Sequence, residues 1–360
     1  MAGPSEAAPR VAFRLDASAA IGGGHAMRCL SLARALADRG ADCLFLVNED
    51  ALAVVPALAG ADCRVVGPDP DAAVAALQAA WPDGADAAVC DLYSWTAQQE
   101  QVFAAAARRL LVIDDLAAAP HHCDLLLNQN FGAVASAYDG LVPPGCRRLV
   151  GLDYALLRPD FAALRPAALE RRQAAGRPGT ILVSLGLTDV GGITGRVCAA
   201  LAAIPGFARA EVVLGPAAPS IARVRSLADA DPRFRCHVGL DDMAQAMLQA
   251  DAAIGAMGSS SWERCCLGLP TLAVTLADNQ RPTAQALVAS GIVALAGDTA
   301  ALDDAALRAA IAAFLGDTDG LRRLSRASAD LCDGLGAGRV AAALLDGLER
   351  NGSRAGHARA

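Results

Sequence analysis

Two series of short apolar runs, each alternating with amphipathic helical stretches, constrain the fold of this chain more than any other feature. Such alternation is typical of βαβ units, in which helices cover both faces of a mainly parallel sheet. The first series predicts strands at residues 11–16, 43–47, 64–66, 87–91, 110–114 and 149–151. The second predicts strands at residues 180–185, 211–214, 234–238, 252–255, 271–275 and 292–295. We therefore predict an α/β protein with two doubly wound, Rossmann-like domains and a cleft between them.

The length of the chain supports this division, because 360 residues exceed what one hydrophobic core usually organises. Residues 158–179 are rich in arginine and proline, which predicts a linker or connecting helix. The expected domains are therefore residues 1–157 and 180–330, followed by a last helix at 331–350. The final ten residues, 351–360, are expected to form a disordered tail.

Composition and charge exclude several classes of function. Hydrophobic residues make up 54% of the chain, the net charge is -7, and Lys and Arg form no cluster, so we expect no nucleic-acid or membrane partner. Without a signal peptide or an apolar stretch that spans a membrane, the expected location is the cytoplasm. The eleven cysteines and five histidines lack the spacing of a metal site, so we expect reduced thiols, no metal and no cofactor.

A glycine-rich motif follows the first predicted strand, which ends at Asp16. Gly22, Gly23 and Gly24 form a turn that lets a substrate approach the backbone, and the next residue, His25, opens a helix. The helix dipole disfavours imidazolium there, which keeps the ring able to accept a proton as a general base. Spacing alone leaves open the alternative that His25 only caps or packs beside the turn.

Tyr93 follows the predicted strand at 87–91, just before a helix that Thr96 and Gln99 mark with a capping box. Its phenol is placed to bond a sugar hydroxyl or the reacting centre, or else to pack as an amphipathic aromatic at the sheet edge. The adjacent Asp114 and Asp115 end the next strand. Because neighbouring strand residues point to opposite faces, we expect one of them to cap or to form an ion pair instead of both forming an acid–base couple.

The second half contains two loops of small residues that each join a strand to a helix, a combination that binds phosphate. Glu263 follows the second loop, in the first turn of the helix, where it is positioned to accept hydrogen bonds from the ribose hydroxyls. The alternative role for the three serines of that loop, 259–261, is ordinary helix capping. Near the end of a later strand, residues 277–280 carry amide and carboxylate groups suited to a polar ligand or to a cap. The candidate ligand-binding residues of these segments are Gly186, Thr188, Gly258, Ser259, Ser260, Ser261, Glu263, Asn279 and Gln280.

Taken together, these motifs resemble the UDP-sugar hydrolases of pseudaminic acid biosynthesis, the PseG/SpsG type. The resemblance covers most of the chain and rests on RLDAS (14–18), IGGGHAMRC (21–29), Asp91-x-Tyr93, DDLA (114–117), CDLLLNQN (123–130), YALLR (154–158), GSSSWER (258–264) and ADNQ (277–280). One departure concerns the phosphate loop, where Leu187 replaces the second glycine of the Gly-Gly-[Thr/Ser]-Asp pattern.

The resemblance implies a GT-B fold like that of MurG, in which the helix at 331–350 crosses back to the first domain. It also implies that UDP-2,4-diacetamido-2,4,6-trideoxy-β-L-altropyranose is the substrate, in a pathway that serves flagellin glycosylation. His25 is then the catalytic base, Tyr93 and Asn279 line the same site, and the serine loop with Glu263 holds UDP. Arg28 is included among the substrate-binding residues.

The expected reaction is attack of water on the anomeric carbon, with C–O cleavage, inversion and UDP as the leaving group. A diphosphate leaves as a stabilised anion, so the acidic partner that glycosidases need is dispensable. Asp16 is expected to orient His25 or to bind a sugar hydroxyl. A MurG-like glycosyltransferase and a noncatalytic nucleotide-sugar-binding protein are the alternatives, and the sequence is silent on oligomeric state.

Overall fold

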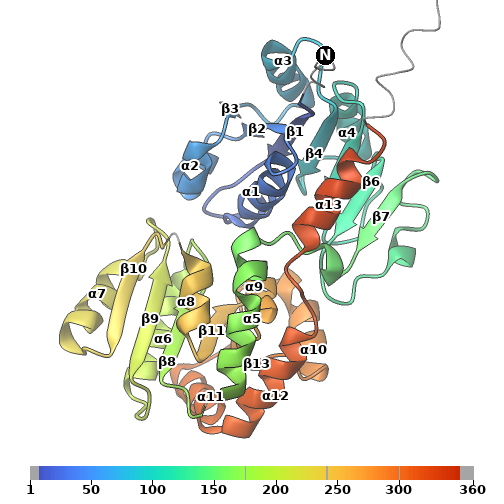
Figure 1. Ribbon diagram of the computed structural model, residues 1–360. Coiled ribbons are helices and arrows are strands. Elements are labelled where there is room, and N and C mark those ends of the chain that lie inside the picture. Colours follow the sequence, from blue (N-terminus) through green and yellow to red (C-terminus); the bar gives the residue numbers. More distant parts are fainter. Residues whose placement is uncertain (1–7, 175, 241, 300, 349–360) are drawn as a thin grey trace, which may run out of the picture. The chain divides into compact units, whose positions relative to one another are not determined.

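Each strand series predicted from the sequence forms one parallel sheet, and the two sheets belong to different units of the chain. The first unit comprises residues 1–158 together with 335–360, and the second comprises residues 159–334. The computed structural model describes residues 8–174, 176–240, 242–299 and 301–348, so the tail expected at 351–360 lies outside the described residues. The two sheets confirm the predicted α/β fold with two doubly wound parts (Figure 1).

The sheet of the first unit has the strand order β3-β2-β1-β4-β5-β6-β7, with every neighbouring pair parallel. Its strands are β1 (Arg10–Leu15), β2 (Asp42–Val47), β3 (Cys63–Val65), β4 (Ala87–Asp91), β5 (Leu110–Ile113), β6 (Leu125–Asn128) and β7 (Arg147–Val150). The central strands β1, β4, β5 and β6 are almost wholly buried, as expected for a sheet covered on both faces.

Helices cover both faces of this sheet. Val11, Phe13 and Leu15 of β1 pack on one face with α1 and α13, whereas Ala12 joins the core on the other face with α3 and α4. Figure 1 shows α13 in red beside α1, which it contacts. The helical segments of this unit are α1 (Gly24–Ala37), α2 (Ala51–Val54), η1 (Pro56–Gly60), α3 (Pro70–Ala80), α4 (Ala97–Ala104), η2 (Ala135–Tyr138), η3 (Leu152–Tyr154) and α13 (Gly336–Leu345).

The second unit repeats the plan around a sheet of strand order β10-β9-β8-β11-β12-β13, again parallel throughout. Its strands are β8 (Thr180–Ser184), β9 (Arg209–Leu214), β10 (Phe234–Val238), β11 (Ala252–Ala256), β12 (Thr271–Thr275) and β13 (Ala294–Asp298). Its helical segments are α5 (Pro159–Ala174), η4 (Val190–Gly192), α6 (Ile193–Ala202), α7 (Ile221–Ala230), α8 (Met243–Gln249), α9 (Ser260–Cys266), η5 (Asp278–Gln280), α10 (Arg281–Ala289), α11 (Asp304–Gly316) and α12 (Thr318–Ala329).

Two strands differ from the sequence prediction, and a third segment adopts one of the two forms predicted for it. Strand β6 was not predicted, because a loop and not a helix connects it to β5. Strand β13 begins at Ala294, two residues later than expected, and pairs with β12 through an irregular register. Residues 158–179, predicted as a linker or connecting helix, mostly form the helix α5, which packs against α8, α9 and α12 inside the second unit.

In each sheet the strand order reverses once, between β1 and β4 in the first unit and between β8 and β11 in the second. At such a point the loops after the two central strands turn to opposite faces, which leaves room for a ligand outside their carboxyl ends. The glycine–histidine motif follows β1 and the Tyr93 motif follows β4. The Gly186 loop follows β8 and the serine loop, residues 258–261, follows β11. Each pair of candidate motifs therefore lies at the reversal point of its own sheet.

Candidate functional site

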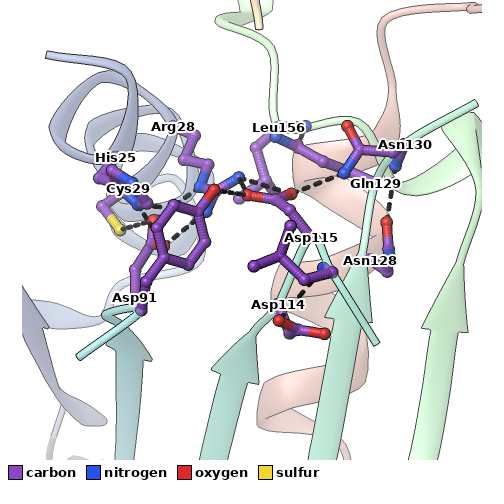
Figure 2. Close-up of polar contacts among 12 residues, drawn as sticks. His25, Arg28, Cys29, Asp91, Asp114, Asp115, Asn128, Gln129, Asn130 and Leu156 are labelled. Carbon is purple, nitrogen blue, oxygen red and sulfur yellow. Dashed lines mark hydrogen bonds and ion pairs between the residues drawn. The ribbon is translucent and has the colours of Figure 1, made fainter. Parts of the chain in front are cut away.

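The polar side chains of the first unit gather above the carboxyl ends of β4, β5 and β6, next to the start of α1 (Figure 2). The register pairs Leu15, the last residue of β1, with Asp91, the last residue of β4. Because the chain then runs from β1 through the glycine turn into α1, the first turn of that helix is held beside Asp91. This arrangement brings His25 and Arg28 to the strand ends.

His25, the second residue of α1, forms a short hydrogen bond with Asp91. The ring Nδ1 lies 2.6 Å from Asp91 Oδ1, and both side chains are buried. A carboxylate only accepts, so Nδ1 donates a proton to this bond, and in the neutral form of the ring the lone pair is then on Nε2. Within the described residues Nε2 makes no hydrogen bond. The pair therefore leaves one basic nitrogen for a ligand or a water molecule.

Arg28 connects the two carboxylates of the site. Its Nε and Nη2 donate to Asp91 at 2.6 and 2.5 Å, and its Nη1 donates to both oxygens of Asp115, at 3.0 and 2.8 Å. Burial alone would raise the pKa of Asp91, but Arg28 and His25 hold it far below its usual value. Asp91 therefore stays ionised. Arg28, which we expected to bind substrate, instead has its donors engaged inside the site.

Tyr93 and Asn130 both donate to Asp115. The Tyr93 hydroxyl donates to Oδ2, and Asn130 Nδ2 donates to Oδ1 at 2.7 Å. The Tyr93 ring also meets the His25 ring edge-on, with centroids 4.7 Å apart, while half of its surface is exposed. Burial and the charge of Asp115 raise the pKa of Tyr93, so the phenol keeps its proton.

Asp16 lies after β1 but does not contact His25. Its Oδ1 pairs with Arg14 Nη1 at 2.5 Å, whereas the imidazole bonds Asp91. The expectation that Asp16 orients His25 is therefore corrected, and Asp91 takes that role. The choice between these carboxylates was not visible in the sequence, because 66 residues separate His25 from Asp91.

The three glycines before His25 shape the entry to α1. Gly22 has φ +84°, which favours glycine, and its N–H donates to the Ser18 carbonyl at 2.8 Å. Gly23 is the N-cap and Gly24 the first helical residue, and no side chain caps the helix. The first-turn N–H groups beside His25 are thus left without a side-chain acceptor.

In the second unit, the loop after β8 keeps an open backbone despite Leu187. Gly186 has φ +93°, and no atom lies within 4 Å of the position that a Cβ would take there. Asp189, in the left-handed conformation and fully buried, accepts backbone N–H groups of two later segments at 2.8 and 3.0 Å. Thr188, between them, is half-buried. The loop is therefore anchored through Asp189 while Gly186 stays accessible.

A buried cation that sequence reasoning missed underlies the serine loop. Arg264 Nη1 donates to Ser260 Oγ at 3.1 Å, and its Nη2 donates to Ser261 Oγ at 3.1 Å and to the Ala256 carbonyl at 2.7 Å. Burial lowers the pKa of Arg264 to about 10. Among the described residues no carboxylate pairs with it. The spacing of Arg264 three and four residues after these serines is the signal that could have revealed it.

The remaining candidates of the second unit lie at two strand ends. Glu263 is half-buried in α9, after Gly258 and Ser259. The Gln280 side chain accepts the N–H of Leu276 at 3.0 Å, so it closes its own loop. Asn279 belongs to η5, and its side chain lies outside the part that the structure describes.

Neither a metal-binding cluster nor a membrane-spanning helix occurs among the described residues. No group of three or more His, Cys, Asp or Glu side chains there is arranged to hold a metal ion. None of the helices in residues 8–174, 176–240, 242–299 and 301–348 has both the length and the apolar character needed to cross a bilayer.

The chain, with two doubly wound units, has the GT-B fold. MurG of Acinetobacter baumannii superposes with a TM-score of 0.64 at 14% identity, covering 93% of this chain and 99% of MurG. The calicheamicin glycosyltransferase CalG4 superposes with a TM-score of 0.62 at 16% identity, covering 96% and 99%. At this level of identity the likeness establishes the fold.

Two curated proteins are similar to this chain in sequence. The spore coat polysaccharide biosynthesis protein SpsG of Bacillus subtilis is 29% identical over 64% of this chain and 66% of its own length, slightly under two thirds. The UDP-2,4-diacetamido-2,4,6-trideoxy-beta-L-altropyranose hydrolase of Campylobacter jejuni is 25% identical over 78% of this chain and 97% of its own. No family model matches the chain. The chain is a GT-B protein similar to SpsG and to this hydrolase.

Proposed function

We propose that this protein hydrolyses a UDP-linked diacetamido-trideoxyhexose to UDP and the free sugar. The observation that carries the proposal is the hydrogen bond of His25 Nδ1 with Asp91, which leaves Nε2 of the ring without a partner among the described residues, at the carboxyl ends of the strands. A neutral base fixed in one tautomer is what activation of water requires. The likeness to the Campylobacter jejuni hydrolase supports the choice of substrate.

In the proposed reaction His25 Nε2 takes a proton from water while the water oxygen bonds to the anomeric carbon. The bond between that carbon and the diphosphate oxygen breaks, its electron pair leaves with UDP, and the configuration inverts. The imidazolium that forms is stabilised by the ionised Asp91, 2.6 Å from Nδ1. Tyr93, packed against the ring, limits its rotation. No acid is needed at the leaving group, and the reaction as proposed uses no metal ion.

The charges of the first unit suit the sugar better than the diphosphate. Asp91 and Asp115 face a single guanidinium, Arg28, so the group carries one net negative charge while His25 is neutral. Such a site repels phosphate and favours the positive charge that develops at the anomeric carbon. Asp16 remains a candidate to bind a sugar hydroxyl.

We propose that the loops of the second unit bind the UDP part. Gly186 offers open backbone, Arg264 supplies a buried positive charge beneath Ser260, and Glu263 is assigned the ribose hydroxyls. Thr188, Gly258, Ser259, Ser261 and Gln280 are assigned to the same ligand, whereas Asn279 is assigned to the catalytic step.

A glycosyltransferase is the second candidate, and the likeness of the fold to MurG and CalG4 favours it. It differs in one observable respect, since a transferase releases UDP only when an acceptor is present. A noncatalytic nucleotide-sugar-binding protein would bind the same ligand without turnover. The basic Nε2 of His25, open in the described structure, favours hydrolysis over both.

The test measures UDP release from UDP-2,4-diacetamido-2,4,6-trideoxy-β-L-altropyranose in oxygen-18 water, with a chelator and without acceptor. We expect release, the label in the sugar, and loss of turnover but not of UDP binding in His25→Ala. Label in UDP would mean attack at phosphorus. Release that requires an acceptor would establish the transferase, and turnover that stops with the chelator would overturn the metal-independent reaction.

A further inference from the structure

Asp115 has no remaining capacity to bind a ligand directly. Its Oδ1 accepts from Arg28 and from Asn130, and its Oδ2 accepts from Arg28 and from Tyr93. Two oxygens with four donors are close to the limit of a carboxylate. Asp115 therefore acts on the ligand through the groups that it orients.

Asp115 only accepts hydrogen bonds, which determines which atoms of Asn130 and Tyr93 are left to bind another group. Asn130 must turn its NH2 group toward the carboxylate, so its carbonyl oxygen points away (Figure 2). The Tyr93 hydroxyl donates its single proton to Asp115, so its oxygen can only accept any further hydrogen bond. Within the described part of the chain the Asn130 carbonyl oxygen has no hydrogen-bond partner, and the residue is half-buried.

A buried chain of hydrogen bonds holds Asn130 from the other side. The Asn130 N–H donates to Asn128 Oδ1 at 3.0 Å, and Asn128 Nδ2 donates to the Tyr138 hydroxyl at 2.9 Å. The Tyr138 hydroxyl donates in turn to Asp114 Oδ2 at 2.8 Å. Asn128, Tyr138 and Asp114 are each at most 6% exposed.

The direction of every bond in this chain follows from Asp114. Burial alone would raise the pKa of Asp114, but His121, the Ala117 N–H and the Tyr138 hydroxyl lower it to about 2, so it is an anion that only accepts. Tyr138 must therefore donate to Asp114 and accept from the NH2 group of Asn128. The carbonyl oxygen of Asn128 is then free to accept the N–H of Asn130.

We propose that Asn130 is a further substrate-binding residue, whose amide oxygen accepts a hydrogen bond from an N–H or O–H group of the sugar. Tyr138, which does not face the ligand, is its positioning residue. The inference rests on the proposed function and adds a selectivity rule to it. Asn130 Oδ1, Tyr93 Oη and His25 Nε2 are all acceptors, so the site matches an uncharged ligand rich in donors, such as the N–H groups of acetamido substituents.

The test compares binding of the intact UDP-diacetamido-trideoxyhexose with binding of UDP by calorimetry, in a His25→Ala background that keeps the sugar nucleotide intact. We expect Asn130→Ala to weaken binding of the sugar nucleotide about tenfold and to leave the affinity for UDP unchanged. Asn130→Asp should weaken it further, because a second carboxylate then faces Asp115. Equal affinities in the parent and the Asn130→Ala protein would overturn the assignment.

The role of Tyr138 is separable from a general loss of stability. If Tyr138 acts through Asn130, Tyr138→Phe weakens sugar-nucleotide binding on its own but adds nothing in the Asn130→Ala protein. Additive losses in the double variant would show that Tyr138 is merely structural. Thermal unfolding of each variant identifies any that fail to fold. Failure of this inference leaves the UDP-release assay untouched, whereas failure of hydrolysis leaves the binding comparison valid.

Discussion

Replacing Asp91 by Asn tests the central pair of the site with almost no change in volume. Asp91 is buried and accepts from Arg28 Nε and Nη2 at 2.6 and 2.5 Å and from His25 Nδ1 at 2.6 Å. An amide has one accepting oxygen, which Arg28 will take, so its NH2 group turns toward His25. The imidazole then has to accept at Nδ1, and its proton moves to Nε2.

Two losses follow from this rearrangement. Breaking a buried ion pair on one side costs about 3–5 kcal/mol of unfolding free energy, and we expect about 3 kcal/mol because Arg28 keeps Asp115. The protonated Nε2 cannot accept a proton from water, so the contribution of a general base, about 10²–10⁴ in rate, is lost from kcat. In activation free energy this loss corresponds to about 3–5 kcal/mol.

The assay measures kcat for UDP release, urea denaturation and the ¹⁵N shifts of the His25 ring, which report the tautomer. Glu211→Gln is the matched control, because that carboxylate pairs with His237 of the second unit at 2.6 Å, the same distance as in the pair of Asp91 and His25. We expect its kcat to stay within about threefold of the original. A fall in kcat of less than about fivefold in Asp91→Asn, or equal losses of kcat in both variants, would refute the proposed role of Asp91.

Three further predictions concern other parts of the chain. Burial lowers the pKa of His121, but Asp114 and Glu100 raise it to about 9. The stability from its charged form is thus complete below about pH 6.5 and falls by about 1–2 kcal/mol, reduced by solvent screening, as pH rises through 9. Urea denaturation should find this dependence on pH absent in His121→Gln. Arg264→Lys removes the guanidinium that donates to the serine loop and should weaken UDP binding about tenfold, as measured by calorimetry. An unchanged affinity would refute a role of Arg264 in UDP binding. Gly336→Ala places a Cβ 2.3 Å from the Ala155 carbonyl oxygen and should cost about 1–3 kcal/mol, whereas Gly338→Ala in the same helix meets no atom closer than 3.7 Å and should be neutral or stabilising.

The fold was predictable because the strands of a doubly wound sheet are apolar runs with helices between them. Strand β6 was not predicted, because its four residues follow β5 after an 11-residue loop without a helix, at 114–124. Gly22 and Gly186 were recognisable in sequence, and both have the positive φ that their turns require.

The site was predictable only to the extent that strand ends can be identified in sequence. His25 and Tyr93 follow the correct strands, and the structure brings their rings together. The partners Asp91 and Asp115 depended on which strands are neighbours and on their register, and neither follows from local spacing. The chain of hydrogen bonds that holds Asn130 runs through Tyr138. Nothing in the local sequence indicates that the hydroxyl of this tyrosine forms buried hydrogen bonds.

The return of the last helix to the first unit has a consequence for how the protein is made. Residues 159–334 form the second unit without a break, so a ribosome releases every part of it before α13 emerges. Val340, Ala341 and Leu344 of α13 are fully buried in the core of the first unit, and until they arrive the part of that core beside α1 is uncovered. The unit synthesised first is therefore completed last. A chain that stops before Gly336 would carry a finished second unit and an exposed apolar face, which is the kind of surface that chaperones retain.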